Sequence, residues 1–123
     1  MAADSSKRLQ FRRHQRIKQG RDFARLRQKG KRLVHGCMIA NWLAAAPGDP
    51  SRLGVVVSAK VGNSVKRSRV RRLLRETFRQ HQHHFTEAID LVLVARPSIA
   101  SKGFAGVEQD FLTTLRKAGL LVI

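Results

Sequence analysis

Apolar and polar residues alternate along the chain in a way that divides it into short helices and strands. Between Gly20 and Gly30, Phe23 and Leu26 lie three residues apart in an otherwise polar stretch, which predicts a short helix with a narrow apolar stripe. The next segment, residues 33–46, is mostly apolar and predicts a single strand.

A turn separates this strand from the next apolar segment. Pro47-Gly-Asp-Pro50 contains strong turn formers, and residues 52–59 include the β-branched run Val55-Val56-Val57. Because the two apolar segments are joined by one short turn, we expect them to pair as a hairpin.

The clearest helical pattern spans residues 64–80. Its apolar residues recur at the spacing of one helix face, namely Val70, Leu73, Leu74, Thr77 and Phe78. Asn63 or Ser64 is suited to cap the first turn. This pattern predicts an amphipathic helix that packs one face against a sheet.

Two further elements complete the pattern. Residues 89–95 form a short apolar run typical of a buried strand, and residues 104–118 predict a final helix. Residues 1–15 are polar and basic, so we expect a flexible arm followed by one RNA-binding domain at 16–123. The order α-β-β-α-β-α, with room for an extra short strand, predicts a single-domain α+β two-layer sandwich.

The composition shows a strong positive charge that is concentrated in two places. The formal net charge of the 123-residue chain is +17. Residues 7–32 include 12 basic residues and one acidic residue, and residues 60–79 include 8 basic residues and one acidic residue. The rest of the chain is nearly neutral. Charge placed in this way indicates a polyanionic partner. Nucleic acid is the first candidate, and an anionic membrane surface is the second.

The second basic segment is the predicted helix at 64–80, whose apolar face leaves the opposite arc to arginines. These are Arg69, Arg71, Arg72, Arg75 and Arg79. An ordinary solvated helix face would intersperse acids as ion-pair partners, and here only Glu76 does so. Arginine also suits bidentate contacts with phosphate. We therefore interpret this face as a phosphate-binding surface.

The start of the same helix carries a second set of candidate phosphate ligands. Lys60, Asn63, Lys66 and Arg67 surround the turn at residues 61–64. Backbone N–H groups at a helix start also attract anions. The whole segment at 60–75 is thus suited to grip phosphates.

The sequence from Lys60 to Glu76, KVGNSVKRSRVRRLLRE, resembles the signature of the bacterial ribonuclease P protein component. Gly20-Arg-Asp-Phe23, Leu53–Lys60 and Asp90–Pro97 are similar to the segments that accompany this signature in the family. The resemblance extends from about Arg16 to Leu115.

The resemblance implies a ribosomal-protein-like fold with a left-handed βαβ crossover. It also implies a protein subunit that binds a catalytic RNA and helps remove the 5′ leader of precursor tRNA, while the RNA and its Mg²⁺ ions perform the hydrolysis. Phe23 and Arg27 are then candidates for leader binding. The candidates for RNA contact are Arg16, Lys18, Lys60, Asn63, Lys66, Arg67, Ser68, Arg69, Arg71, Arg72 and Arg75.

Three positions depart from the family pattern, and one of them is Ser64, which stands where the family has alanine. Ser68 stands where the family has asparagine between two arginines, and Arg27 stands where it often has a second aromatic residue. A serine hydroxyl is shorter than an amide. A cleft with one aromatic residue fewer relies more on electrostatics.

Other chemistry finds little support. Eight scattered acids do not provide the clustered carboxylates of a two-metal nuclease, so we expect no catalytic residue in this chain. His81, His83 and His84 lack a cysteine partner, so no metal site is predicted; Cys37 and Trp42 are expected in the core. The single cysteine and the lack of a signal peptide or membrane span predict a cytoplasmic protein.

Two other functions compete with the ribonuclease P interpretation. A structural RNA-binding protein of ribosomal type would share the charge and the fold class. A helix-turn-helix DNA-binding protein is disfavoured, because no partner helix precedes the arginine helix through a short turn. The long motif and Phe23 favour the ribonucleoprotein subunit.

Overall fold

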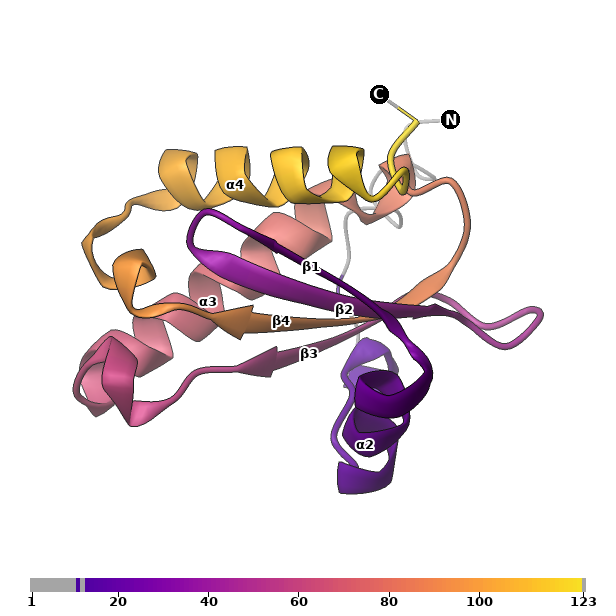
Figure 1. Cartoon of the computed structure of the whole chain (residues 1–123), viewed down its shortest axis with the longest axis horizontal. Helices are drawn as coiled ribbons and strands as arrows, with labels where there is room; N and C mark the ends of the chain where they lie inside the picture. Colours follow the sequence, from indigo (N-terminus) through magenta and orange to yellow (C-terminus); the bar gives the residue numbers. More distant parts are fainter. Residues whose placement is uncertain (1–10, 12, 123) are drawn as a thin grey trace.

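The computed structural model describes residues 11 and 13–122, which form a four-stranded sheet with helices on both of its faces (Figure 1). The strands are β1 (Lys31–His35), β2 (Met38–Ala44), β3 (Arg52–Val56) and β4 (Ile89–Ala95). The α-helices are α2 (Gly20–Lys29), α3 (Ser64–His81) and α4 (Phe104–Lys117). Short 3-10 helices occur at Arg13–Gln15, Ala59–Val61, Gln82–His84 and Pro97–Ser101.

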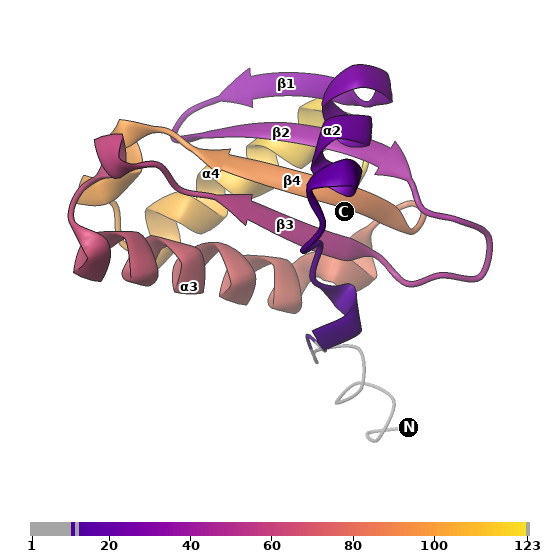
Figure 2. The ribbon, with the colours of Figure 1, turned by 90° about the horizontal axis from the view of Figure 1, so that it is seen from below.

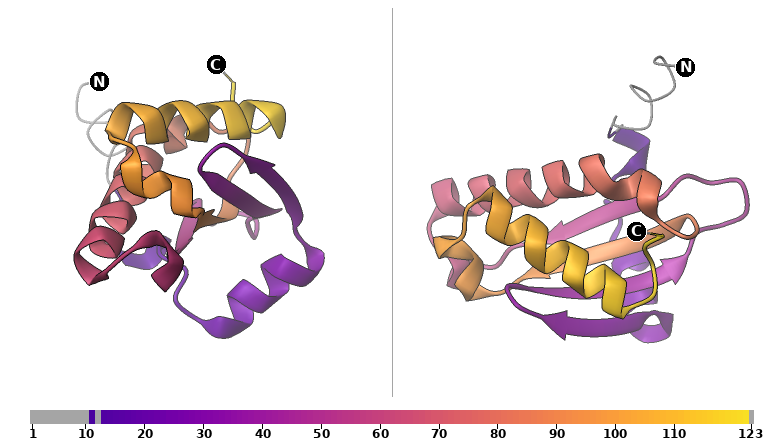
Figure 3. Two further views of the ribbon diagram at one scale, coloured as in Figure 1. Left: turned by 60° about the vertical axis from the view of Figure 1, so that its left-hand side comes forward. Right: turned by 90° about the horizontal axis from the view of Figure 1, so that it is seen from above.

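The strand order β1-β2-β4-β3 places β4 inside the sheet. β2 is antiparallel to both of its neighbours, whereas β3 and β4 are parallel and are connected through α3. Helices α3 and α4 lie side by side over one face of the sheet, and α2 crosses the other face (Figures 2 and 3). The predicted α+β single domain is confirmed, and β3–α3–β4 is its βαβ unit.

The single strand predicted at residues 33–46 is wrong. The chain reverses at Gly36, whose φ of +57° is a conformation that favours glycine, and so divides the segment between β1 and β2. The amide of Cys37 donates a hydrogen bond of 2.9 Å to Asp110 on α4, which fixes this turn. The extra strand for which the predicted order left room is therefore β1.

The predicted hairpin between residues 33–46 and 52–59 is also wrong, because β4 lies between β2 and β3. Residues of β4 are buried on both faces of the sheet, as its unbroken apolar run requires. A central position in the sheet buries both faces of β4, and β3 therefore forms the edge of the sheet.

The main core lies between the sheet and helices α3 and α4. Val70, Leu74, Thr77 and Phe78 of α3 are fully buried and Leu73 is half-buried, which confirms the predicted apolar face. Phe111 and Leu115 of α4 complete this layer. Cys37 and Trp42 are buried, as predicted. Each large apolar side chain buried here contributes about 1.5–3 kcal/mol to folding.

The predicted flexible arm falls mostly on residues 1–10 and 12, which lie outside the described residues. The part of the arm that the structure describes is packed on the domain. The rings of Phe11 and Phe78 pack edge to face, with their centres 5.4 Å apart. The side-chain amide of the buried Gln15 donates a 3.0 Å hydrogen bond to the carbonyl of Ser51. Within the predicted arm, Phe11 and Gln15 thus pack against the domain.

Candidate nucleic-acid interface

The surface of α3 that faces away from the core carries the predicted arginines. Asn63 caps the helix, because its Oδ1 accepts a 2.9 Å hydrogen bond from the amide of Lys66. Burial of the opposite face sets the rotation of the helix, so its arginines point outward. Arg69 and Arg72 are exposed, and Arg67, Arg71 and Arg75 are half-buried.

Positive charges crowd one another on this surface. Burial lowers the pKa of Arg75, and the charges of Arg16 and Arg71 lower it further. A guanidinium group remains charged at neutral pH, so the lowered pKa records an unfavourable energy in the free protein. A polyanion placed over these side chains offsets the repulsion among Arg16, Arg71 and Arg75, which favours binding to phosphate.

A groove of about 450 Å³ forms where the N-terminal segment passes α3. We call it the arginine groove; it is lined by Phe11, Arg16, Ser68, Arg72, Arg75, Glu76 and Arg79. The guanidinium carbon of Arg16 lies 5.3 Å from the ring centre of Phe11, a cation–π contact. Four of the predicted RNA-contacting residues, Arg16, Ser68, Arg72 and Arg75, thus share one groove.

Among the described residues that line the arginine groove, Glu76 is the one acid. Its carboxylate accepts hydrogen bonds of 3.1 Å from Arg79 Nε and from Gln80 Nε2. The bonds from Arg79 and from Gln80 lower the pKa of Glu76 against the opposing effect of burial. The ionised carboxylate therefore orients Arg79 at the end of the groove.

The candidate ligands around the start of α3 also lie together. Lys60, Asn63 and Lys66 are all exposed beside its first turn. The Nε of Arg67 is buried and has no hydrogen-bond partner among the described residues. This group offers two ammonium ions next to the first amides of a helix, an arrangement suited to phosphate.

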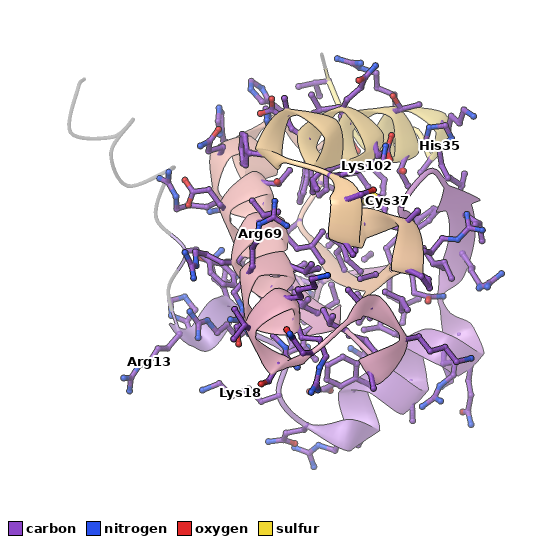
Figure 4. All side chains as sticks on the ribbon, turned by 90° about the vertical axis from the view of Figure 1, so that its left-hand side faces the viewer. Arg13, Lys18, His35, Cys37, Arg69 and Lys102 are labelled. Atoms are coloured by element: carbon purple, nitrogen blue, oxygen red, sulfur yellow. The ribbon has the colours of Figure 1, made fainter. Side chains whose placement is uncertain are left out.

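Three of the predicted RNA-contacting residues, Lys18, Arg69 and Arg71, lie outside these groups. Arg69 donates a 2.8 Å hydrogen bond to the carbonyl of Lys102, so it is tied to the segment before α4 (Figure 4). Lys18 is exposed on the segment that precedes α2 and does not line the arginine groove (Figure 4). Arg71 is half-buried on α3, next to Arg72 in the sequence.

A second hollow, of about 410 Å³, lies on the opposite face of the sheet beside α2. We call it the sheet cleft; it is lined by Phe23, Leu26, Arg27, Asn41, Val56, Val92 and Val94. Both predicted leader-binding residues, Phe23 and Arg27, therefore line one cleft. Its floor is apolar, and the exposed Arg27 and the half-buried Asn41 supply its polar groups.

The absence of a side chain at Gly54 on β3 allows the ring of Phe23 to pack against the strand. A Cβ atom at residue 54 would lie 2.8 Å from Cε1 and 2.9 Å from Cζ of Phe23, so only glycine lets the ring rest on the strand. Phe23 is half-buried and keeps part of its ring accessible. An aromatic ring held against a sheet in this way is a platform on which a base can stack.

A buried carboxylate fixes the position of α2 over the cleft. Asp90, only 3% exposed, accepts hydrogen bonds of 3.1 Å from Arg25 and 2.8 Å from Arg52. Arg52 also lies 3.7 Å from Asp22. Burial raises the cost of breaking such a pair, so these contacts join α2, β3 and β4 firmly.

The sequence interpretation missed several residues of these sites. Phe11, Asn41, Val56 and Val94 were not identified, because nothing local to them signals a groove. Asp90 could have been identified from the sequence, because an acid at the start of an apolar strand is expected to be buried and paired with a basic residue.

One of the three histidines near the end of α3, His81, contacts α4. His81 Nε2 lies 2.8 Å from Glu108 Oε2 and so joins α3 to α4. Within residues 11 and 13–122, no three His, Cys, Asp or Glu side chains are grouped to hold a metal ion. None of the helices that the structure describes is long and apolar enough to cross a membrane.

A family model described as ribonuclease P matches residues 11–119. The chain belongs to the ribonuclease P protein family. It is a protein component of this ribonucleoprotein endoribonuclease, and its partner is the ribonuclease P RNA. This result decides against the ribosomal and helix-turn-helix interpretations.

Relatives and solved structures agree with this family. The chain is 36% identical to the ribonuclease P protein component of Syntrophomonas wolfei, over 85% of this chain and 87% of the relative. It resembles the structure of the Staphylococcus aureus ribonuclease P protein with a TM-score of 0.80 and 29% identity, over 87% of this chain and 97% of that protein. The Thermotoga maritima protein gives a TM-score of 0.74 at 27% identity, covering 83% and 96%.

Proposed function

We propose that the ribonuclease P protein uses its two hollows for two RNAs. The arginine groove and the start of α3 bind the catalytic RNA, and the sheet cleft holds the single-stranded 5′ leader of precursor tRNA. The observation that carries the proposal is that both hollows border β3: Arg16, which lines the arginine groove, forms a β-bridge with Leu53 of β3, and Val56 of β3 lines the sheet cleft. Arg16 lines the arginine groove, while the adjacent Ile17 packs with Leu26 and Val92 behind the cleft.

The chemistry of each hollow suits its proposed ligand. The arginine groove and the start of α3 offer guanidinium and ammonium groups for phosphates, and folded RNA presents its phosphates on the outside. The sheet cleft offers Phe23 and an apolar floor to unpaired bases, which a leader can expose because it has no complementary strand. Arg27 at the rim is placed for the leader backbone.

We assign the hydrolysis to the RNA and its Mg²⁺ ions. The protein contributes binding, since its cations reduce the repulsion between the catalytic RNA and the precursor, which are both polyanions. We infer that it works in the cytoplasm, where precursor tRNA is available. The protein should therefore matter most when little magnesium is present to screen the phosphates.

Reconstitution tests this proposal. The protein is combined with a bacterial ribonuclease P RNA, and cleavage of precursor tRNA is measured as magnesium is lowered. We expect the protein to lower the magnesium needed and to tighten binding of leader-bearing substrate relative to mature tRNA. Processing and affinity equal to those of the RNA alone would overturn the proposal.

A further inference from the structure

The floor of the sheet cleft continues beyond the cleft to the far edge of the sheet. Strand register aligns Val56 with Val94, Val94 with Ile39, and Ile39 with Val34. Residues paired across neighbouring strands share a face, so these four side chains form one row on the α2 side. With strands about 4.8 Å apart, the row is about 14 Å long.

This apolar row is open to solvent along its length. Val56 is 38% exposed at the β3 edge and Val34 is 43% exposed at the β1 edge. Ile39 and Val94, between them, are half-buried. Such a strip of β-branched side chains on an otherwise basic protein is a candidate contact surface for flat apolar groups such as bases.

A parallel row ends in a cation beside this strip. Gly54 pairs with Val92, Val92 with Asn41, and Asn41 with Arg32. Arg32 is exposed and has no ion-pair partner among the described residues. At the β1 edge the apolar row therefore has an arginine next to it that is available to a phosphate.

The order of the surfaces gives the row a direction. The arginine groove and the start of α3 lie on the β3 side of the sheet, where Ile17 also joins Leu53 through a 2.9 Å backbone hydrogen bond. A strand that leaves the catalytic RNA there enters the row at β3 and reaches β1 last. Under the proposed function, nucleotides at β1 are thus farther along the leader from the catalytic RNA than those at β3.

We propose that the leader-binding site extends across all four strands, and that Arg32 binds the backbone of leader nucleotides upstream of those held at Phe23. This inference rests on the proposed function and adds a second contact region to it. A short leader ends within the sheet cleft, whereas a longer leader reaches Val34 and Arg32. Binding should therefore strengthen with leader length until the β1 edge is occupied.

The experiment compares two neighbouring charge-removing variants in the reconstituted particle. Arg32→Gln removes the charge beside the row, and Lys31→Gln removes a charge that is also exposed and that alternation along β1 directs to the other face. Affinities are measured for precursors with leaders of about 4 and about 12 nucleotides, within the range of known single-strand sites. We expect Arg32→Gln to weaken only the long-leader complex, by about threefold to fivefold.

The results separate this inference from the function on which it rests. Equal affinity of the wild-type particle for both leaders, or equal losses for Arg32→Gln and Lys31→Gln, would overturn the extended site. Both results leave the short-leader preference over mature tRNA intact. Absence of any preference for leader-bearing substrate would instead overturn the proposed function itself. Matched unfolding curves for the two variants confirm that folding does not cause the difference.

Discussion

The contact between Gly54 and Phe23 provides a sharp test of the leader platform. A methyl group added by Gly54→Ala would meet Phe23 Cε1 at 2.8 Å and Ile17 Cβ at 3.3 Å. Carbon atoms rest at about 3.5–4.0 Å, so the ring must withdraw by about 0.7 Å or more. Overpacking of this kind costs about 1–3 kcal/mol of stability.

Displacement of the ring should also weaken leader binding. A stacked base contributes about 1–3 kcal/mol, so losing even the lower part of this range weakens binding of leader-bearing precursor about fivefold. Binding of mature tRNA should not change. The assay compares Kd values of the two substrates with the reconstituted particle, below the unfolding temperature of the variant.

The matched control is Gly106→Ala on α4. A Cβ atom there meets its nearest neighbour at 3.6 Å, an ordinary contact, and alanine favours the helix. We expect unchanged leader binding and equal or higher stability for this control. If Gly54→Ala also leaves the leader preference and the stability at wild-type values, then Phe23 does not rest on Gly54 as a leader platform.

Three further predictions concern charge and titration. Arg72→Ala should weaken affinity for the ribonuclease P RNA and reduce the salt slope by about one phosphate contact, whereas Arg116→Ala, at the far end of α4, should leave the slope unchanged. Burial raises the pKa of Cys37 to about 12, so a thiol reagent at pH 8 should modify the native protein far more slowly than the urea-unfolded protein. Burial also acts to raise the pKa of Asp110, but hydrogen bonds from Cys37 and Lys102 outweigh it and lower the pKa. The stabilisation from Asp110 is then complete above about pH 4 and is lost as the pH falls further. Urea unfolding of Asp110→Asn should show lower stability at pH 7 and a weaker loss in acid; an unchanged acid profile would contradict this.

Local patterns were sufficient to predict α3 and its arginine face. Helical periodicity places Val70, Leu74 and Phe78 on one side whatever the rest of the chain does, so the outward arc was predictable. The cap by Asn63 likewise depends only on residues three positions apart. The strand β4 was predicted with its observed bounds, because a continuous apolar run is a local signal.

The sheet cleft could not be predicted in this way. Its floor joins Asn41, Val56 and Val94 from three strands, and these meet only because β4 inserts between β2 and β3. Adjacency in sequence favoured a hairpin instead, and the long-range pairing overrode it. Phe23 was identified through the family resemblance, since a lone aromatic residue on a short helix is not a signal by itself.

One paired measurement shows whether the two hollows bind different RNAs. Affinity for the ribonuclease P RNA and preference for precursor over mature tRNA are measured for Phe23→Ala and Arg72→Ala. Phe23→Ala should reduce the leader preference without weakening RNA binding, and Arg72→Ala should weaken RNA binding without reducing the leader preference. Equal effects of both variants on both quantities would contradict it.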